Sequence, residues 1–210
     1  MQLYYDPITV NCRKVLAGLD FVGAKYESVT MDYFGGDHKK AEYVAINPNA
    51  SIPALVDGDF TLWESNAILQ YAADKVGAAQ AYPTDAQTRA DINRWHLWEA
   101  SQWFPTCYVY LVENVVKPIL GETPDAAVLS AEQARFDQCA GILNDRLGHN
   151  DYIVGSNPTI ADIAMAAPMH LHSYQKLPLG AYPNIQAWMA RVESIPAWAK
   201  TDVAPLVGLS

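Results

Sequence analysis

An isoleucine–proline pair at the entrance of a predicted strand constrains the fold of this chain more than any other feature. Ile52-Pro53 follows the loop 47–51 and leads directly into the apolar run 54–56. An X-Pro bond at a strand entrance is well placed to be cis, and proline is tolerated there. A cis proline would leave the preceding backbone groups free to pair with an extended ligand, such as a peptide.

A hairpin and a helix start follow this pair. Asp57-Gly58 separates the runs 54–56 and 60–62, and this dipeptide between two apolar segments is a strong hairpin signal. Glu64-Ser65 then opens a helix predicted over 65–76. Free N–H groups and the helix dipole favour a carboxylate at such a start. The segment therefore predicts a site for a small peptide that carries both an amine and a carboxylate.

The order of predicted elements divides the chain into two domains. Strands at 2–5 and 26–30, helices at 9–21 and 38–43, the hairpin and the helix 65–76 give the order β-α-β-α-β-β-α. This order predicts an α/β thioredoxin-like domain over 1–77. A linker over 78–86 leads to an all-helical domain over 87–210. Helices are expected over 84–112, 124–147, 159–167, 185–192 and 197–200. The first and the third of them are expected to start at capping boxes, Thr84–Gln87 and Thr159–Asp162.

Composition excludes several classes of protein. Half of the 210 residues are hydrophobic and the net charge is −9, which argues against nucleic acid and an anionic membrane as partners. Cys12, Cys107 and Cys139 are widely spaced, which predicts neither a disulfide framework nor a metal site. The sequence shows no leader-like start and no run of membrane-spanning length. A cytoplasmic protein is expected.

Four segments at family spacing resemble the cytosolic glutathione transferases. They are Asn47-Pro48 with Ile52–Leu55, Glu64–Ile68, Arg89-Ala90 with Trp95, and Gly155–Ile163. The segment Gly36–Tyr43 further resembles the plant-type phi class and its bacterial relatives. The resemblance implies a transferase fold, with the thioredoxin-like domain followed by an all-α domain. It also implies a homodimer, glutathione as co-substrate, small hydrophobic electrophiles as second substrates, and neither a metal nor another cofactor.

The resemblance assigns roles around glutathione. Glu64 accepts from the γ-glutamyl ammonium, and Ser65 receives its carboxylate. Ile52, ahead of Pro53, pairs with the cysteinyl unit. Lys39, with His38, holds the glycine carboxylate, and Ser51 stands at a further position that contacts the glycyl end.

Two residues are candidates for activating the thiol. A free thiol is mostly protonated at neutral pH, and a hydroxyl donor near a helix N-terminus favours the reactive thiolate. Thr9 matches the catalytic serine position of the family, and Asn11 follows it as a second donor, as in bacterial transferases that use a threonine and an asparagine. The alternative for Thr9 is a simple helix N-cap.

Three residues depart from the family pattern. Thr9 replaces the serine of the phi class, Ser51 replaces the usual glutamine or lysine, and Ala50 replaces a common glycine. The first change affects the expected catalytic strength. The other two affect the expected contact with the glycyl end of glutathione.

The electrophile pocket is expected between the domains. Candidate lining residues are Ile8, Trp103, Phe104, Tyr108 and Leu111. Aromatic residues at helical spacing are commonly core residues, so packing is the alternative for each of them.

Two other functions remain open from the sequence. Cys12 near a helix start would suit thiol–disulfide exchange if its thiol were exposed and acidified, whereas a buried structural thiol is the simpler interpretation. A glutathione-dependent disulfide reductase or thiol transferase is thus one alternative. The other is a non-catalytic binding module that retains the fold.

Overall fold

The thioredoxin-like half is built on a four-stranded sheet with the order β2-β1-β3-β4. The computed structural model describes residues 1–209. Its strands are β1 (Gln2–Tyr5), β2 (Glu27–Thr30), β3 (Ala54–Asp57) and β4 (Phe60–Trp63). β1 runs parallel to β2 and antiparallel to β3, and β3 and β4 form the predicted hairpin with Gly58 at φ 62°. The predicted parallel pair and hairpin are both present.

Helices cover both faces of this sheet. Leu3 and Leu55 point to one face, where they pack with α1 (Val10–Phe21) and α3 (Ser65–Val76). On the other face Tyr4 contacts Tyr43 of the short helix α2 (Ala41–Val44), with ring centroids 5.9 Å apart. A 3-10 turn, η1 (Asp37–Lys39), precedes α2. The alternation of side chains along the strands thus produces a three-layer α/β domain.

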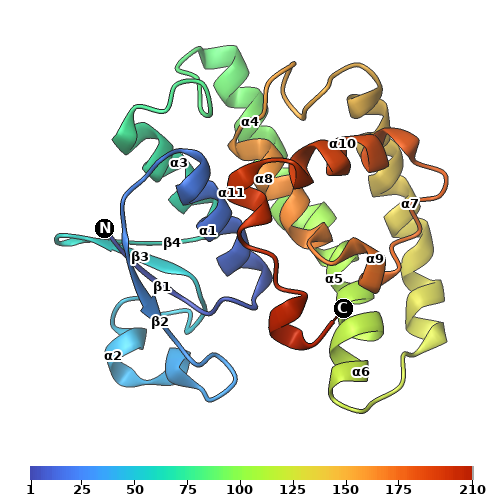
Figure 1. Cartoon of the computed structure of the whole chain (residues 1–210), viewed down its shortest axis with the longest axis horizontal. Coiled ribbons are helices and arrows are strands. Elements are labelled where there is room, and N and C mark those ends of the chain that lie inside the picture. Colours follow the sequence, from blue (N-terminus) through green and yellow to red (C-terminus); the bar gives the residue numbers. More distant parts are fainter. Residues whose placement is uncertain (210) are drawn as a thin grey trace.

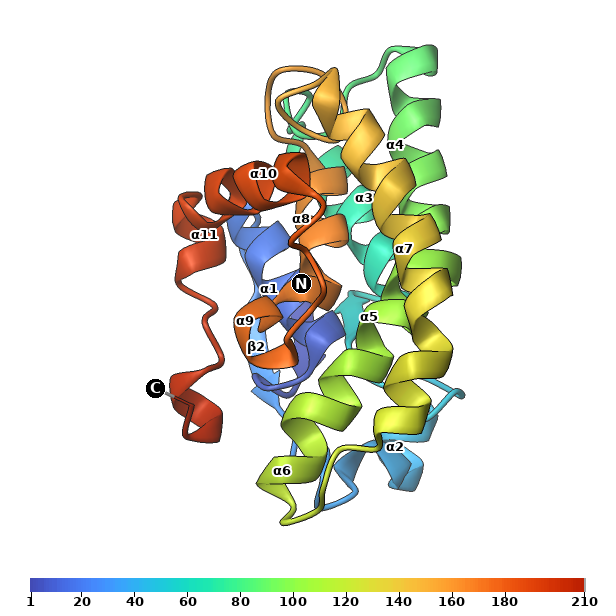
Figure 2. The same cartoon turned by 90° about the vertical axis from the view of Figure 1, so that its right-hand side faces the viewer.

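The second half of the chain is helical, as predicted (Figure 1). One helical run extends from Ala86 to Ile119 and includes two π-helical segments. Its parts are α4 (Ala86–Trp98), η2 (Glu99–Trp103), α5 (Phe104–Leu111), η3 (Val112–Val116) and α6 (Lys117–Ile119). The remaining elements are α7 (Ala126–Gly148), α8 (Ile160–Ala166), η4 (Ala167–Met169), α9 (His172–Gln175), α10 (Pro183–Glu193), α11 (Pro196–Ala199) and η5 (Pro205–Val207). Figure 2 shows α4, α5 and α7 side by side along the helical domain.

Helix starts in this half test the two predicted capping boxes. At α8 the box is confirmed: the Thr159 side chain accepts from the Ala161 N–H, and the Asp162 carboxylate accepts from the Thr159 N–H. The box predicted at Thr84 is wrong. Asp85 is the N-cap of α4, and its carboxylate accepts from the Thr88 N–H at 2.9 Å. A carboxylate one residue later satisfies the free N–H groups, so the helix begins there.

One hydrophobic cluster extends across both halves of the chain. α1 packs against α8 and α11, and α3 also contacts α8. Val10, Ala17 and Leu69 of the first half belong to the same buried cluster as Trp103 and Ile163 of the second. The first turn of α1 is therefore held rigidly beside the helical domain, and the candidate site lies next to this junction.

Candidate active site

The loop before β3 presents an unpaired stretch of backbone. The Ile52-Pro53 bond is cis. The Ser51 carbonyl accepts from the Tyr43 hydroxyl at 2.6 Å and from Asn47 Nδ2 at 2.7 Å. Within residues 1–209, the N–H and C=O of Ile52 take part in no hydrogen bond. The backbone of Ile52 is thus available to an extended ligand, while the carbonyl before it is fixed from behind.

Glu64 immediately precedes α3 in an unusual backbone conformation. Its φ and ψ are 72° and 108°, and its side chain is exposed and makes no capping hydrogen bond. A non-glycine residue at such a positive φ costs roughly 1–3 kcal/mol and is found chiefly at functional sites. The conformation directs Glu64 outward and leaves the N–H groups of the first turn of α3 without a side-chain cap.

Ser65 is the first residue of α3 and is buried in a network of polar side chains. Its Oγ accepts from Lys14 Nζ at 3.1 Å and donates to Asn11 Oδ1 at 3.3 Å. Lys14 forms an ion pair with Glu99 at 2.8 Å, and both side chains are almost completely buried. Asn66 Nδ2 donates to Glu99 Oε2 at 2.9 Å. The start of α3 is therefore tied to α1 and to the π-helical segment η2.

The start of α1 carries the two predicted catalytic residues, and one of them, Asn11, contacts the start of α3. Thr9 is the N-cap of α1 by position, but its hydroxyl makes no capping bond and donates instead to the Asp6 carbonyl at 3.4 Å. Asn11 is half-buried and contacts Ser65. Cys12, by contrast, is completely buried, and burial raises the pKa of its thiol to about 12. Its Sγ accepts from the Asp6 N–H at 3.4 Å.

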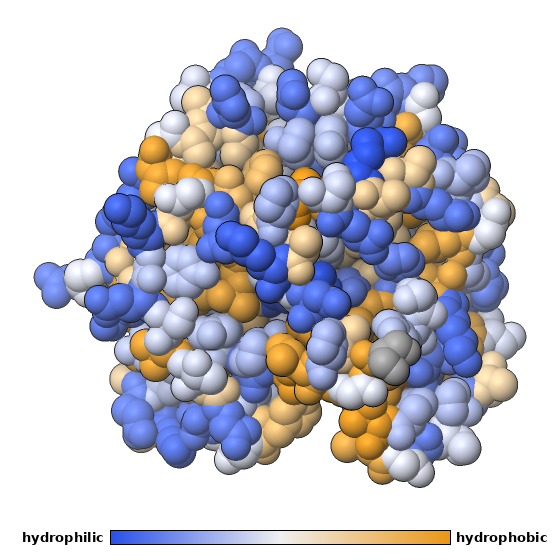
Figure 3. Space-filling model, viewed as in Figure 1, coloured by the Kyte–Doolittle hydropathy of each residue, from blue (hydrophilic) through white to orange (hydrophobic). Residues whose placement is uncertain are grey.

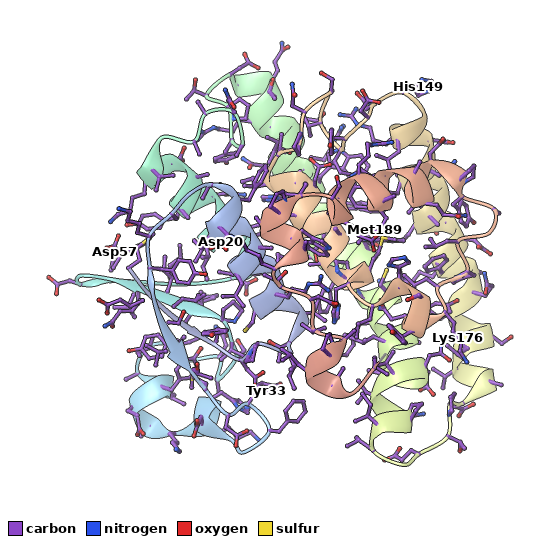
Figure 4. All side chains as sticks on the ribbon, in the orientation of Figure 1. Asp20, Tyr33, Asp57, His149, Lys176 and Met189 are labelled. Atoms are coloured by element: carbon purple, nitrogen blue, oxygen red, sulfur yellow. The ribbon has the colours of Figure 1, made fainter. Side chains whose placement is uncertain are left out.

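Two of the three residues predicted to hold the glycine carboxylate, His38 and Lys39, lie together on η1, whereas Ser51 lies in the loop before β3. His38 is buried and stacks on the Tyr33 ring, with ring centroids 4.3 Å apart, whereas Lys39 is exposed. Figure 4 labels Tyr33 on the loop that follows β2, on the same side of the molecule as α2. His38 thus supports the loop, and Lys39 is the cation that is open to solvent.

The predicted apolar residues divide into two groups. Phe104 and Tyr108 stack on each other at 5.5 Å, and Tyr108 is 45% exposed. Trp103 is completely buried and donates from Nε1 to the Met165 carbonyl at 3.1 Å. Leu111 is also buried. The predicted pocket role of Trp103 and Leu111 is therefore corrected to core packing, because neighbouring helices cover both side chains.

An apolar recess is visible at the lower edge of the molecule. Figure 3 shows the lower edge of the molecule hollowed between its left and right lobes, with hydrophobic surface beside the hollow. Ile8, on the loop before α1, is half-buried, and its N–H donates to Asp6 Oδ1 at 3.0 Å. A separate cavity of about 820 Å³ lies beside Phe21 and Ala78, and no predicted site residue lines it.

Three residues of the site were missed by the sequence analysis. Asp6 is buried and accepts from the Ile8 and Tyr33 N–H groups, so it ties together the two loops around Thr9. Lys14 and Glu99 form the buried ion pair. A signal existed: Lys14 lies four residues after Val10, and Glu99 lies midway between Trp95 and Trp103, so both charges fall on apolar helix faces.

Comparison with known proteins agrees with this geometry. The family model described as "Glutathione S-transferase, N-terminal domain" matches residues 2–74, and the corresponding C-terminal domain model matches residues 108–196. Glutathione S-transferase 3 of Zea mays is 32% identical over 209 residues, covering 97% of this chain and 94% of that protein. The chain belongs to the glutathione S-transferase family.

Solved structures of the family share the fold over nearly the whole chain. A glutathione S-transferase I bound with lactoylglutathione matches with a TM-score of 0.87 and 26% identity, covering 96% of this chain and 98% of that one. A theta-class transferase from Xanthomonas axonopodis pv. citri, with glutathione bound, matches with a TM-score of 0.82 and 28% identity, each chain being covered to 96%. The protein is therefore a transferase enzyme with glutathione as its co-substrate, on the predicted fold. None of the helices formed by residues 1–209 is long and apolar enough to cross a bilayer.

Proposed function

We propose that this enzyme adds the glutathione thiolate to hydrophobic electrophiles, with Thr9 and Asn11 as donors to the sulfur. The observation that supports this proposal best is the contact between Ser65 and Asn11 at 3.3 Å. It joins a helix start suited to a carboxylate with the loop suited to a thiolate. One tripeptide is proposed to reach both while it pairs with the free backbone of Ile52, which lies in the loop just before β3.

The proposed pose assigns each end of glutathione to a charged or polar group. The γ-glutamyl ammonium meets Glu64, and its carboxylate meets Ser65 and the uncapped N–H groups of α3. The glycine carboxylate meets Lys39, with His38 holding the loop and Ser51 at its edge. The cysteinyl unit pairs with Ile52, held by Pro53, which directs the sulfur toward Thr9 and Asn11.

Two features support Thr9 and Asn11 as donors to sulfur. The Thr9 hydroxyl is not engaged in capping, and its bond to Asp6, at 3.4 Å, is long enough to be exchanged easily. Asn11 uses its Oδ1 toward Ser65, which leaves the donor end of the amide, Nδ2, for the ligand. Both residues stand at the start of the 12-residue helix α1, whose dipole favours an anion. This pair would place the enzyme with the bacterial Thr/Asn relatives.

The electrophile is proposed to lie on Phe104 and Tyr108, opposite Ile8, in the apolar recess. The proposed assembly is a cytoplasmic homodimer with a twofold axis, in which each domain 1–77 faces the partner's domain 87–210. The linker 78–86 is proposed to join the two domains within each chain. The buried thiol of Cys12 argues against disulfide exchange through that residue, because a protonated and inaccessible sulfur is inert.

The test is conjugation of glutathione to an aryl halide by the purified protein. The pKa of bound glutathione is read from the pH profile of kcat/KM for the aryl halide at saturating glutathione. Thr9→Ala and Asn11→Ala should each lower kcat/KM by about 10- to 100-fold, as expected for one lost hydrogen bond to a charged atom. Both should also raise the bound thiol pKa. Ser101→Ala removes a hydroxyl that donates to Leu97 on the exposed helix surface, and it serves as the control. Unchanged rates and pH profiles in both variants would refute the donor roles.

A further inference from the structure

We propose that Lys14 is a positioning residue for the γ-glutamyl carboxylate, because its buried ammonium orients Ser65 and presents positive charge behind it. This inference rests on the proposed binding of glutathione at Glu64 and Ser65. It assigns a task to a buried ion pair that lies behind the site and that the proposed reaction does not itself use.

The direction of the hydrogen bonds follows from the chemistry of the groups. An ammonium only donates, so Ser65 Oγ must accept from Lys14 at 3.1 Å. The single proton of Ser65 therefore points away from Lys14, and it is donated to Asn11 Oδ1 at 3.3 Å. A bound carboxylate at the start of α3 would accept this single proton in place of Asn11 Oδ1. Lys14 thus sets the serine hydroxyl as a donor toward the ligand side.

The charges of the pair are also ordered relative to the site. Lys14 contacts Ser65 directly, whereas Glu99 contacts Lys14 and Asn66 on the side of η2. The ion pair is neutral as a whole, but its positive end is the end nearer to Ser65. Its field therefore adds to the positive end of the α3 dipole at the same place. Both side chains are at most 2% exposed, so water screens this field little.

A purely structural role is the competing explanation, because the pair joins α1 to the helical domain. The two explanations separate when both charges are removed together. Replacing a buried ion pair by neutral side chains of similar size is often close to neutral for stability, whereas removing one partner leaves an uncompensated charge. A structural pair would be replaceable, whereas a positioning lysine would not.

The experiment compares Lys14→Met/Glu99→Gln with the wild type, with Glu99→Gln alone and with Lys14→Arg. The double variant should keep its Tm within a few degrees, because the glutamine still accepts from Asn66. Its KM for glutathione should rise about 10-fold with kcat changed less than about 3-fold. Glu99→Gln should lose stability yet bind glutathione at least as tightly, and Lys14→Arg should retain most of the affinity. Lys75→Met, which removes a lysine paired with Asp57 at the surface, is the matched control with unchanged KM.

A ligand that lacks the relevant group completes the test. In 4-aminobutyryl-cysteinyl-glycine the α-carboxylate of the γ-glutamyl unit is absent, so wild type and double variant should bind it equally well. The proposal is overturned if the double variant retains the wild-type affinity for glutathione. It is equally overturned if the variant loses the same factor with both ligands. A wild-type protein that binds glutathione without conjugating it would refute the proposed reaction but not the role of Lys14, which the binding constants would still decide.

Discussion

Removal of the Asp162 carboxylate should unfold this protein at a much lower temperature without changing its affinity for glutathione. Asp162 is completely buried at the start of α8. Its two oxygens accept from the N–H groups of Ile153 and Thr159, both at 2.8 Å, from Thr159 Oγ1 at 3.2 Å and from Trp188 Nε1 at 2.9 Å. One side chain thus joins a loop, a helix start and α10.

The expected cost follows from the donors that would be stranded. Asp162→Ala leaves three buried N–H groups without an acceptor, and each costs about 1–3 kcal/mol. Burial also raises the pKa of Asp162, so removing a carboxylate that is costly to bury returns part of this free energy. We therefore take the low end for each N–H donor and add about 1 kcal/mol for the Thr159 hydroxyl, which also loses its acceptor, and this gives about 4 kcal/mol. For a chain of this size the Tm should fall by about 8–16 °C.

The assay is thermal unfolding followed by circular dichroism, with glutathione affinity measured by calorimetry well below the transition. Asp125→Ala is the matched control, since Asp125 caps α7 at the surface through the Ala127 N–H at 2.8 Å. Loss of this cap should lower the free energy of unfolding by about 1 kcal/mol, because water can satisfy exposed N–H groups. A Tm for Asp162→Ala equal to or above that of Asp125→Ala would refute the reasoning.

Three further expectations come from buried or strained residues. Cys12 should resist iodoacetamide in the native protein at pH 8 and react on unfolding, because its pKa is raised to about 12; rapid native labelling would contradict its burial. Ala50 has φ 48°, so Ala50→Gly should stabilise the fold by up to ~1 kcal/mol in denaturant titrations, and a lower unfolding midpoint in the variant would contradict this. Burial lowers the pKa of His96 to about 4 and of His170 to about 3, so the unfolded state binds protons first as the pH falls below about 6.5. The free energy of unfolding should then decrease from pH 6.5 toward pH 4 by up to ~1.4 kcal/mol per pH unit for each histidine, and His170→Gln should reduce that slope.

Local sequence signals predicted the elements whose determinants are themselves local. The hairpin at Asp57-Gly58 and the helix 65–76 depend on turn chemistry and on a helix start, and both appear as predicted. The capping box at Thr159 is confirmed for the same reason. The start of α4 was misplaced by one residue because Thr84 and Asp85 are both good caps, and the acceptor used depends on the path of the linker.

Long-range contacts explain the parts of the site that the sequence did not predict. Trp103 and Phe104 are neighbours in the chain, yet Trp103 is completely buried while Phe104 stacks on the exposed Tyr108. Which of them faces the core depends on the π-helical segment η2, which shifts the helix register in a way that no simple periodicity reveals. The partnership of Lys14 with Glu99 likewise spans 85 positions and depends on how the two domains pack.

Three helices of the second half and the two longer helices of the thioredoxin-like domain begin in different ways. Within residues 1–209, α4, α7 and α8 each begin at a side chain that accepts from their own first turn, namely Asp85, Asp125 and Thr159. The longer helices of the thioredoxin-like domain, α1 and α3, begin at Thr9 and Glu64 without such a bond. Free N–H groups at a helix start need an acceptor, and a bound anion can supply it. Because Asn11 and Ser65 join these two uncapped starts, a ligand with a carboxylate near one start and a thiolate near the other would satisfy both. Thr9 and Glu64 thus leave the first turns of α1 and α3 without a side-chain cap, and in the proposed pose the substrate supplies the acceptors.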